Sequence, residues 1–291
     1  MNNPNDLTGK TAVVTGATAG IGLYSLLALA RAGAFVIGIG RDAQRNRQAL
    51  EFARQACPEA QVSFLLADLA LQSQVRRLGQ DICSALEAHG TPYLDILVNN
   101  AGIYSQKLVR TTEGIELTLA VNHLAVFLLT HELLPVLNAA QHGRVITVSS
   151  HSHTRARMNP ARLNNPPVYI GIWAYALSKL ANILFTYELN RRLRGNHLHA
   201  YAVDPGLVNT DIGIKQAGAL SHLVWRNRAK HGQPPALPAE TVLLLSRDGN
   251  PENEHVYWYN CQPIHPSPQA QREDLARELW QVSCELCQIE W

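Results

Sequence analysis

The sequence predicts a single α/β domain built as a doubly wound parallel sheet covered by helices on both faces. Three observations support this fold class: strand and helix patterns alternate along the chain, the strands are continuously apolar, and no linker divides the 291 residues. Continuously apolar strands indicate burial on both faces of a sheet, and repeated βα units give a parallel sheet flanked by helices. We therefore expect residues 1–291 to form one domain.

The predicted elements follow one another in a regular order. A β-branched run over residues 10–15 predicts the first strand, and a helical pattern over residues 21–32 ends at Gly33, because glycine accepts the backbone conformation found just beyond a helix. Short apolar runs predict further strands, and longer amphipathic segments predict further helices. The strands are expected over residues 34–40, 62–67, 94–98, 144–148 and 198–203, and the helices over residues 42–56, 71–89, 112–138 and 173–194.

Two long segments interrupt the alternation. Residues 151–172 and residues 205–238 are rich in proline or glycine, and both are far longer than an ordinary loop between a strand and a helix. Each leaves the sheet at the carboxyl end of a strand, where open α/β sheets bind ligands. We expect both to be substrate loops, although a solvated surface loop is an equally good interpretation of residues 151–172.

Composition limits the function classes. Lys and Arg total 25 against 23 Asp and Glu, without a basic block, which excludes the electrostatic footprint of a nucleic-acid binder. The chain starts with polar residues, and the apolar stretch over residues 117–137 is interrupted by Asn122, His123, His131 and Glu132, so neither a signal peptide nor a transmembrane segment is expected. Five irregularly spaced cysteines suit reduced thiols, which predicts a cytoplasmic protein without a metal site.

A glycine-rich turn joins the first predicted strand to the first predicted helix. Glycines allow a tight turn and a close approach of the backbone to a ligand, and the helix N-terminus attracts a pyrophosphate. Close packing alone would also explain three glycines, but their place at the start of a βαβ unit predicts a dinucleotide site. The predicted cofactor-binding residues of this turn are Gly16, Ala17, Thr18, Ala19, Gly20, Ile21 and Gly22.

The end of the second strand indicates which dinucleotide binds. An acidic residue there would hold the ribose 2′-hydroxyl of NAD, whereas arginine accommodates the 2′-phosphate of NADP. The strand is followed by Arg41 and then by Asp42, with Arg45 nearby. NADP(H) is therefore favoured over NAD(H). The alternative interpretation is that Arg41 is a solvated loop charge and that Asp42 caps the next helix.

Tyr175 and Lys179 are four residues apart in a predicted helix and lie on one helical face. A cation about 4 Å from a phenol contributes roughly 4 kcal/mol at an effective dielectric constant of about 20. This predicts a tyrosine pKa lowered toward neutrality, which suits an acid or base. The pair also fits an ordinary amphipathic helix, but Ser149 and Ser150 end a neighbouring strand at the same rim.

The chain resembles the short-chain dehydrogenase/reductase family, whose fold is a single NAD(P)-binding Rossmann domain. The resemblance rests on a set of motifs that occur along this chain in the same order as in the family. They are TGATAGIG over residues 15–22, Asp68, NNAG over residues 99–102, Asn122, Ser150, Tyr175 with Lys179, and Pro205-Gly206. It is most similar to the retinol-dehydrogenase-like branch, through AVNHLAVFLLT over residues 120–130, WAYALSKLANILF over residues 173–185, and the tail that begins with PSPQAQREDLARELWQVS at residue 266.

The resemblance implies a role for each matching residue. Tyr175 would be the general acid/base, Lys179 would lower its pKa and bind the nicotinamide ribose, Ser150 would polarise the substrate carbonyl, and Asn122 would hold a relay water. Among these, Asn122 could instead be a helix kink satisfied within the protein. The further cofactor contacts that the family implies are Asp68, Asn100, Pro205, Gly206, Val208 and Thr210.

These observations lead to one principal hypothesis. The chain is expected to be an NADP(H)-dependent oxidoreductase that transfers hydride between nicotinamide and a lipophilic aldehyde, ketone or alcohol, a small-molecule substrate. The alternatives are a non-catalytic dinucleotide-binding sensor or interaction protein and a double-bond reductase on the same fold. Family members pair through the helices that correspond to residues 112–138 and 173–194, so the resemblance implies a homodimer or homotetramer.

Overall fold

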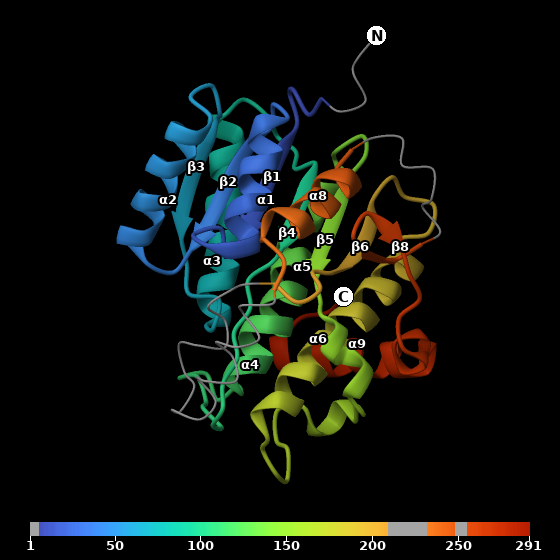
Figure 1. Ribbon diagram of the computed structural model, residues 1–291. Helices are drawn as coiled ribbons and strands as arrows, with labels where there is room; N and C mark the ends of the chain where they lie inside the picture. The colour runs from blue at the N-terminus through green and yellow to red at the C-terminus, as the bar shows by residue number, and fades with distance from the viewer. Residues whose placement is uncertain (1–5, 209–231, 248–254) are drawn as a thin grey trace.

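The computed structural model describes residues 6–208, 232–247 and 255–291, and it contains one eight-stranded sheet. The strand order is β3-β2-β1-β4-β5-β6-β7-β8; neighbouring strands are parallel except β8, which is antiparallel to β7 (Figure 1). The order reverses between β1 and β4, which is where doubly wound sheets bind ligands. The strands are β1 (Thr11–Thr15), β2 (Phe35–Gly40), β3 (Val62–Leu66), β4 (Ile96–Asn99), β5 (Arg144–Val148), β6 (His199–Asp204), β7 (Tyr257–Tyr259) and β8 (Gln262–Pro263).

Helices cover both faces of this sheet. Alternate strand residues point to opposite faces, so Val13 packs with α3 and α5 while Ala12 and Val14 pack with α1 and α8. Helix α9 lies outside α6, away from the sheet (Figure 1). The α-helices are α1 (Gly20–Arg31), α2 (Ala43–Ala56), α3 (Gln72–Ala88), α4 (Leu117–Leu119), α5 (Ala125–Asn138), α6 (Gly171–Arg192), α8 (Ala236–Leu245) and α9 (Glu273–Cys287).

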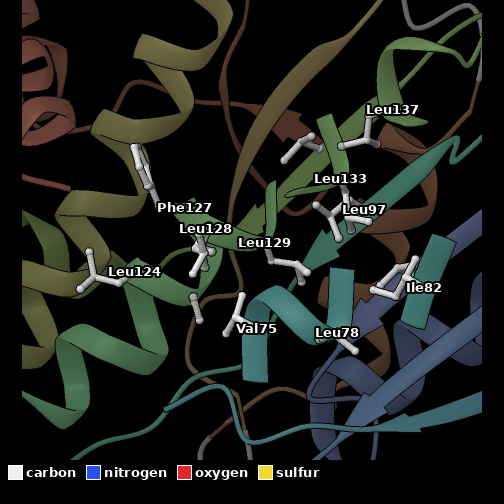
Figure 2. Packing of buried hydrophobic residues seen from close by; sticks show 14 of the residues in the cluster. Val75, Leu78, Ile82, Leu97, Leu124, Phe127, Leu128, Leu129, Leu133 and Leu137 are labelled. Carbon is white, nitrogen blue, oxygen red and sulfur yellow. The ribbon is translucent and has the colours of Figure 1, made fainter. Parts of the chain in front are cut away.

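The larger core cluster lies between the sheet, α3 and α5. Val75, Leu78 and Ile82 recur at helical spacing along α3, and they face Leu129 and Leu133 of α5 (Figure 2). This spacing places a single apolar stripe on α3, and burial of that stripe fixes α3 and α5 against the sheet. The packing holds the carboxyl ends of β1 and β4 side by side.

The structure corrects several predicted elements. The helix expected over residues 112–138 begins at Leu117, because the Glu116 carboxylate accepts hydrogen bonds from the N–H groups of Thr118 and Leu119. Residues Ala120–Leu124 then form a π-helical turn before α5. Strands β7 and β8 and helix α8 were not predicted, since β7 and β8 have three and two residues and α8 lies at the end of the expected 205–238 loop.

The expected loop over residues 151–172 also has internal structure. It contains two 3₁₀ turns, His151–Arg155 and Pro160–Arg162, and a third such turn, Pro268–Gln271, precedes α9. His153 is buried rather than solvated. The interpretation of residues 151–172 as a fully solvated loop is therefore wrong for this part of the segment.

One helical stretch in the described part of the chain has the length and composition of a membrane span. An 18-residue window of Leu117–Asn138 has a mean hydropathy of 1.5, although the stretch contains the polar residues that argued against a span. In the folded protein 78% of that window is buried. The core helix of a globular domain meets the same criterion, because it is covered by protein on all sides.

Helix α9 covers the surface that was expected to join copies of this chain. Trp280 of α9 packs on Phe127 of α5 and Phe185 of α6, with ring centroids 5.0 and 5.8 Å apart. All three side chains are buried within one chain. The homodimer or homotetramer expected through these two helices therefore lacks an open surface at this position.

Candidate active site

The glycine-rich turn takes the backbone conformations that its sequence predicts. Gly16 has φ +66° and Gly20 has φ +54°, values that favour glycine. Helix α1 begins at Gly20, and Ala19 at its N-cap offers no side-chain hydrogen bond to the first N–H groups. The start of α1 therefore has the donors and the dipole that attract a phosphate group.

A cavity of about 490 Å³ opens at the carboxyl ends of β1 and β4, where the strand order reverses. Of the predicted cofactor contacts, Gly16, Thr18, Ala19, Gly20, Ile21, Arg41, Asp68 and Asn100 line it. Lining residues that the sequence did not single out include Tyr24, Leu69, Ile103, Tyr104 and Val121. A long cavity that joins a glycine-rich turn to the ends of neighbouring strands fits a dinucleotide.

Two residues of the glycine-rich turn lie outside this lining. Ala17 is buried, and its N–H donates to the Ile39 carbonyl. A Cβ atom on Gly22 would lie 2.3 Å from the Gly16 oxygen and 2.4 Å from Asn100 Nδ2. Gly22 is therefore required by close packing of α1 against the turn, and any direct contact of Ala17 or Gly22 with a cofactor remains a prediction.

Asn100 and Asp68 stabilise the loops around the cavity. Asn100 Nδ2 donates to the Thr15 carbonyl at 2.8 Å, and its backbone N–H donates to Thr15 Oγ1 at 3.0 Å. Asp68 Oδ1 accepts the N–H of Ala70 at 3.0 Å. Both residues therefore shape the cavity wall as well as line it.

The junction of β2 and α2 presents cations to the cavity. Arg41 and Arg45 both line it, and Arg41 is exposed. Asp42 is the N-cap of α2, and its Oδ1 accepts the N–H of Arg45 at 2.9 Å. The interpretation of Asp42 as a helix cap is thus confirmed, and part of its carboxylate is engaged by α2.

Ser149 and Ser150 have different surroundings at the end of β5. Ser149 is buried, and its hydroxyl donates to the Lys179 carbonyl at 2.8 Å, which ties β5 to α6. Ser150 is the N-cap of the following 3₁₀ turn, and its side chain also hydrogen bonds to Tyr175. The structure therefore places Ser150, rather than Ser149, beside the candidate acid/base.

Tyr175 is the fifth residue of α6 and lies half-buried beside the cavity. Its ring centroid is 6.4 Å from that of the cavity-lining Tyr104. Burial raises the pKa of Tyr175 to about 12; the hydrogen bond with Ser150 opposes this rise, and the negative charge of Asp204 adds to it. The predicted lowering of this pKa by Lys179 is therefore wrong for the protein alone, because desolvation outweighs the favourable interactions.

Lys179 is buried behind the tyrosine. Its ammonium group donates to the Val148 carbonyl at 3.0 Å and lies over the Tyr175 ring, 5.6 Å from the centroid. A Cβ atom on the cavity-lining Gly102 would be 3.4 Å from Lys179 Nζ, so the ammonium group lies close to the cavity wall. Burial lowers the pKa of Lys179 to about 8.

Replacing Lys179 by methionine is expected to stabilise the protein by about 2 kcal/mol at pH 7, because methionine needs no buried charge. The lysine pKa falls from its ordinary 10.5 to about 8 on folding. Between these two pH values the lysine holds its proton in the unfolded chain but loses it in the folded protein. The free energy of unfolding of the wild type therefore rises with pH over this range, and the stabilisation gained by methionine decreases. Denaturant unfolding of the wild type and of Lys179→Met at pH 7 and pH 10 measures this change. Lys107→Met, a substitution at an exposed position, is the control. A difference in unfolding free energy between wild type and Lys179→Met that stays the same at both pH values would contradict the prediction.

Asn122 lies in the π-helical turn and is fully buried. Its Oδ1 accepts the N–H of Ile103 at 2.8 Å, while Nδ2 donates to the Ile103 carbonyl and to Ser178 Oγ, each at 3.0 Å. Ser178 Oγ in turn donates to the Tyr175 carbonyl. Asn122 therefore joins the loop after β4 to α6; both amide hydrogens have protein acceptors, and a bound relay water remains a prediction.

The Pro205–Gly206 turn follows β6. Gly206 has φ +69°, and a Cβ atom there would lie 2.9 Å from both Gln233 and Tyr259. Val208 forms an isolated parallel bridge with Gln233, which also donates to the Pro205 carbonyl at 2.6 Å. Thr210 lies outside the described residues, and contacts of Pro205, Gly206 and Val208 with a cofactor remain predictions.

A buried polar network behind Ser150 was missed at the sequence level. Asp204 accepts the Tyr257 hydroxyl at 2.9 Å and the Gly206 N–H at 2.9 Å. His153 Nε2 accepts the N–H of Ser267 at 3.1 Å, so Nδ1 is the donor toward the Ser150 carbonyl, 2.9 Å away. The only sequence signal was an acidic residue directly before Pro205, and only the fold brings these groups together.

Known proteins show which family this arrangement belongs to. A family model described as short chain dehydrogenase matches residues 10–219. A Bos taurus protein named dehydrogenase/reductase SDR family member 13 is 38% identical, over 96% of this chain and 74% of its own. Mus musculus retinol dehydrogenase 12 is 35% identical, over 98% of this chain and 88% of its own.

Solved structures agree with this result. A Mycobacterium paratuberculosis protein is 32% identical with a TM-score of 0.75, covering 98% of this chain and 96% of the other. A metagenomic short-chain oxidoreductase in complex with NADP is 25% identical with a TM-score of 0.63, covering 89% and 98%. The chain belongs to the short chain dehydrogenase family, a class of oxidoreductases that use a nicotinamide cofactor. Within that family it is retinol-dehydrogenase-like and acts on CH–OH or carbonyl groups.

Proposed function

We propose that this protein is an NADP(H)-dependent reductase and dehydrogenase for lipophilic aldehydes, ketones or alcohols. The observation that carries the proposal is the meeting of Ser150, Tyr175 and Lys179 at the end of β5 and the start of α6, beside the cavity. The cavity fits the cofactor, since the glycine-rich turn and the positive end of α1 would hold its pyrophosphate.

The side chains divide the work of the reaction. A nicotinamide cofactor held in the cavity would supply the hydride for reduction or accept it in oxidation. Ser150 orients the substrate oxygen and donates a hydrogen bond to it, while Tyr175 gives its hydroxyl proton to that oxygen during reduction and recovers it during oxidation. The buried ammonium group of Lys179 favours the phenolate that forms during reduction.

The protonation state of Tyr175 favours carbonyl reduction near pH 7. With a pKa of about 12, the phenol carries its proton at neutral pH and is ready to donate it. Oxidation of an alcohol needs the phenolate, so its rate is expected to rise with pH. The same pKa therefore predicts opposite pH responses in the two directions.

The substrate is proposed to be lipophilic because apolar groups surround the site. Leu207, which follows the Pro205–Gly206 turn, is exposed; Ile103 and Tyr104 line the cavity, and Tyr104 lies beside Tyr175. Loss of NADPH absorbance should be followed with a panel of aldehydes, ketones and retinoids. Turnover confined to apolar carbonyl compounds supports the proposal, and failure of every compound with both NADPH and NADH would contradict it.

Arg41 is proposed to select NADP(H) through its guanidinium group. Replacing Arg41 by alanine is expected to lower kcat/KM for NADPH by about 10- to 100-fold, since a charged hydrogen bond contributes about 1.5–3 kcal/mol. The value for NADH should change little. Arg47→Ala, an exposed arginine on α2, is the control, and an equal loss for both cofactors in Arg41→Ala would argue against selection by this residue.

A further inference from the structure

An exposed apolar ridge precedes and begins helix α6. Val168 is 73% exposed and Trp173 is 60% exposed, while Ile170 and Ile172 are 49% and 41% exposed. Four large apolar side chains within six residues are unusual on a protein surface, and a contiguous patch of this kind marks an interaction site. We call these four residues the apolar ridge.

The ridge is held in place by the residues between its members. Tyr169 points inward, where its hydroxyl donates to the Ser105 carbonyl and to Glu116 Oε1, each at 3.1 Å. Gly171 is buried and packs directly against the backbone of Ser105, because a Cβ atom on Gly171 would lie only 2.3 Å from the Ser105 carbonyl oxygen. Inward anchoring of Tyr169 and Gly171 therefore turns the apolar side chains of the ridge toward solvent.

The neighbouring loop extends the apolar surface. Leu108 and Val109 are exposed and belong to the segment on which Tyr169 and Gly171 are anchored. Arg110 joins the two segments, since its guanidinium donates to the Asn164 carbonyl at 3.2 Å and to Asn165 Oδ1 at 2.8 Å. The ridge and Leu108–Val109 thus form one apolar surface on two connected segments.

The part of the chain that carries the ridge has basic but no acidic side chains. Residues 133–187 contain no Asp or Glu. The acidic side chain of Glu113, in the neighbouring loop, is engaged by Ser73 and the N–H of Gln72 at the start of α3. The exposed cations of residues 102–116 and 151–172, the two loops that carry this surface, are Lys107, Arg110, Arg155, Arg157 and Arg162.

We propose that this surface docks the protein on an anionic lipid bilayer, with the ridge inserted among the headgroups and the arginines paired with lipid phosphates. Apolar side chains bury area at the headgroup boundary, and each nearby cation adds attraction to anionic lipid. Pairing of two copies through the same surface is disfavoured, because it would bring five cations of one copy against five of the other. The proposal does not depend on the proposed chemistry, since vesicle binding needs no turnover.

Vesicle flotation tests this docking. The protein is mixed with vesicles of phosphatidylcholine alone or of phosphatidylcholine with phosphatidylserine, at low and high salt. We expect binding to the anionic vesicles that weakens with salt. The double variant Val168→Ser/Ile170→Ser should bind at least about tenfold more weakly, and Arg155→Gln/Arg157→Gln should lose the preference for phosphatidylserine.

The controls separate docking from loss of fold. Phe52→Ser removes an exposed aromatic residue from α2, away from the ridge, and should bind as the wild type does. The circular dichroism spectrum and the urea unfolding midpoint of the ridge variant should match those of the wild type, since both substitutions are at exposed positions. Absence of binding to both vesicles, or equal binding by wild type and ridge variant, would overturn the proposal; so would a change of oligomeric state in the ridge variant without a change in vesicle binding.

Discussion

Replacing Tyr175 by phenylalanine is expected to lower kcat about 1,000-fold while leaving cofactor affinity within a factor of about three, because general acid–base catalysis contributes about 10²- to 10⁴-fold. The substitution removes one oxygen and keeps the ring, which lies beneath the Lys179 ammonium group and near Tyr104. The walls of the cavity therefore stay in place. Steady-state turnover with a reducible carbonyl compound measures the loss, and NADPH fluorescence titration measures the cofactor affinity.

Tyr187 offers a matched control for this experiment. It lies three turns further along α6, partly buried against an apolar cluster. Tyr187→Phe removes the same hydroxyl group from the same helix, and its turnover should stay within about twofold of wild type. If Tyr175→Phe retained near-normal turnover, Tyr175 would not be the acid/base; if it lost NADPH binding as well, its hydroxyl would act in binding.

Replacing Trp280 by alanine is expected to lower the free energy of unfolding by about 3–5 kcal/mol, the range for large aromatic residues removed from a core. Trp280 joins α9 to the rest of the protein: it stacks on Phe185 with planes 19° apart, and Arg192 lies 4.3 Å from its ring centroid. Its Nε1 also donates to the Trp291 carbonyl at 3.1 Å. Truncation would leave a large void between α5, α6 and α9.

Urea unfolding followed by circular dichroism measures this effect. Trp173→Ala serves as control, because it removes the same side chain from an exposed position and should change stability by less than about 0.5 kcal/mol. The variant Trp280→Ala should also expose the α5–α6 surface, and its size in solution can be compared with that of the wild type. A loss below 1 kcal/mol would show that α9 contributes little to the fold.

Some features of the site could be predicted because they depend on local spacing. The glycine-rich turn was expected from the order strand, glycines, helix, and Tyr175 and Lys179 were expected on one face because four residues make about one helical turn. Asp42 was weighed as a helix cap from its place before α2, and it is one. Each of these predictions requires only neighbours in sequence.

Other features could not be predicted, because they depend on burial and on contacts between distant segments. The pKa of Tyr175 rises rather than falls, since desolvation by the folded chain outweighs the hydrogen bond with Ser150. His153, Tyr257 and Asp204 meet from three segments that carry no shared motif. The covering of α5 and α6 by α9 likewise depends on where the C-terminal helix packs.

By itself the sequence determined the order of strands and helices, the glycine-rich turn and the types of reactive side chain, because hydrophobic period and turn chemistry act over a few residues. The tertiary structure alone decided which groups are desolvated, which hydrogen-bond partners they have and which apolar surface stays open. The physical reason is that burial and electrostatic environment are properties of the packed chain: the same phenol, amide or tryptophan has a different pKa, partner or exposure according to what packs around it.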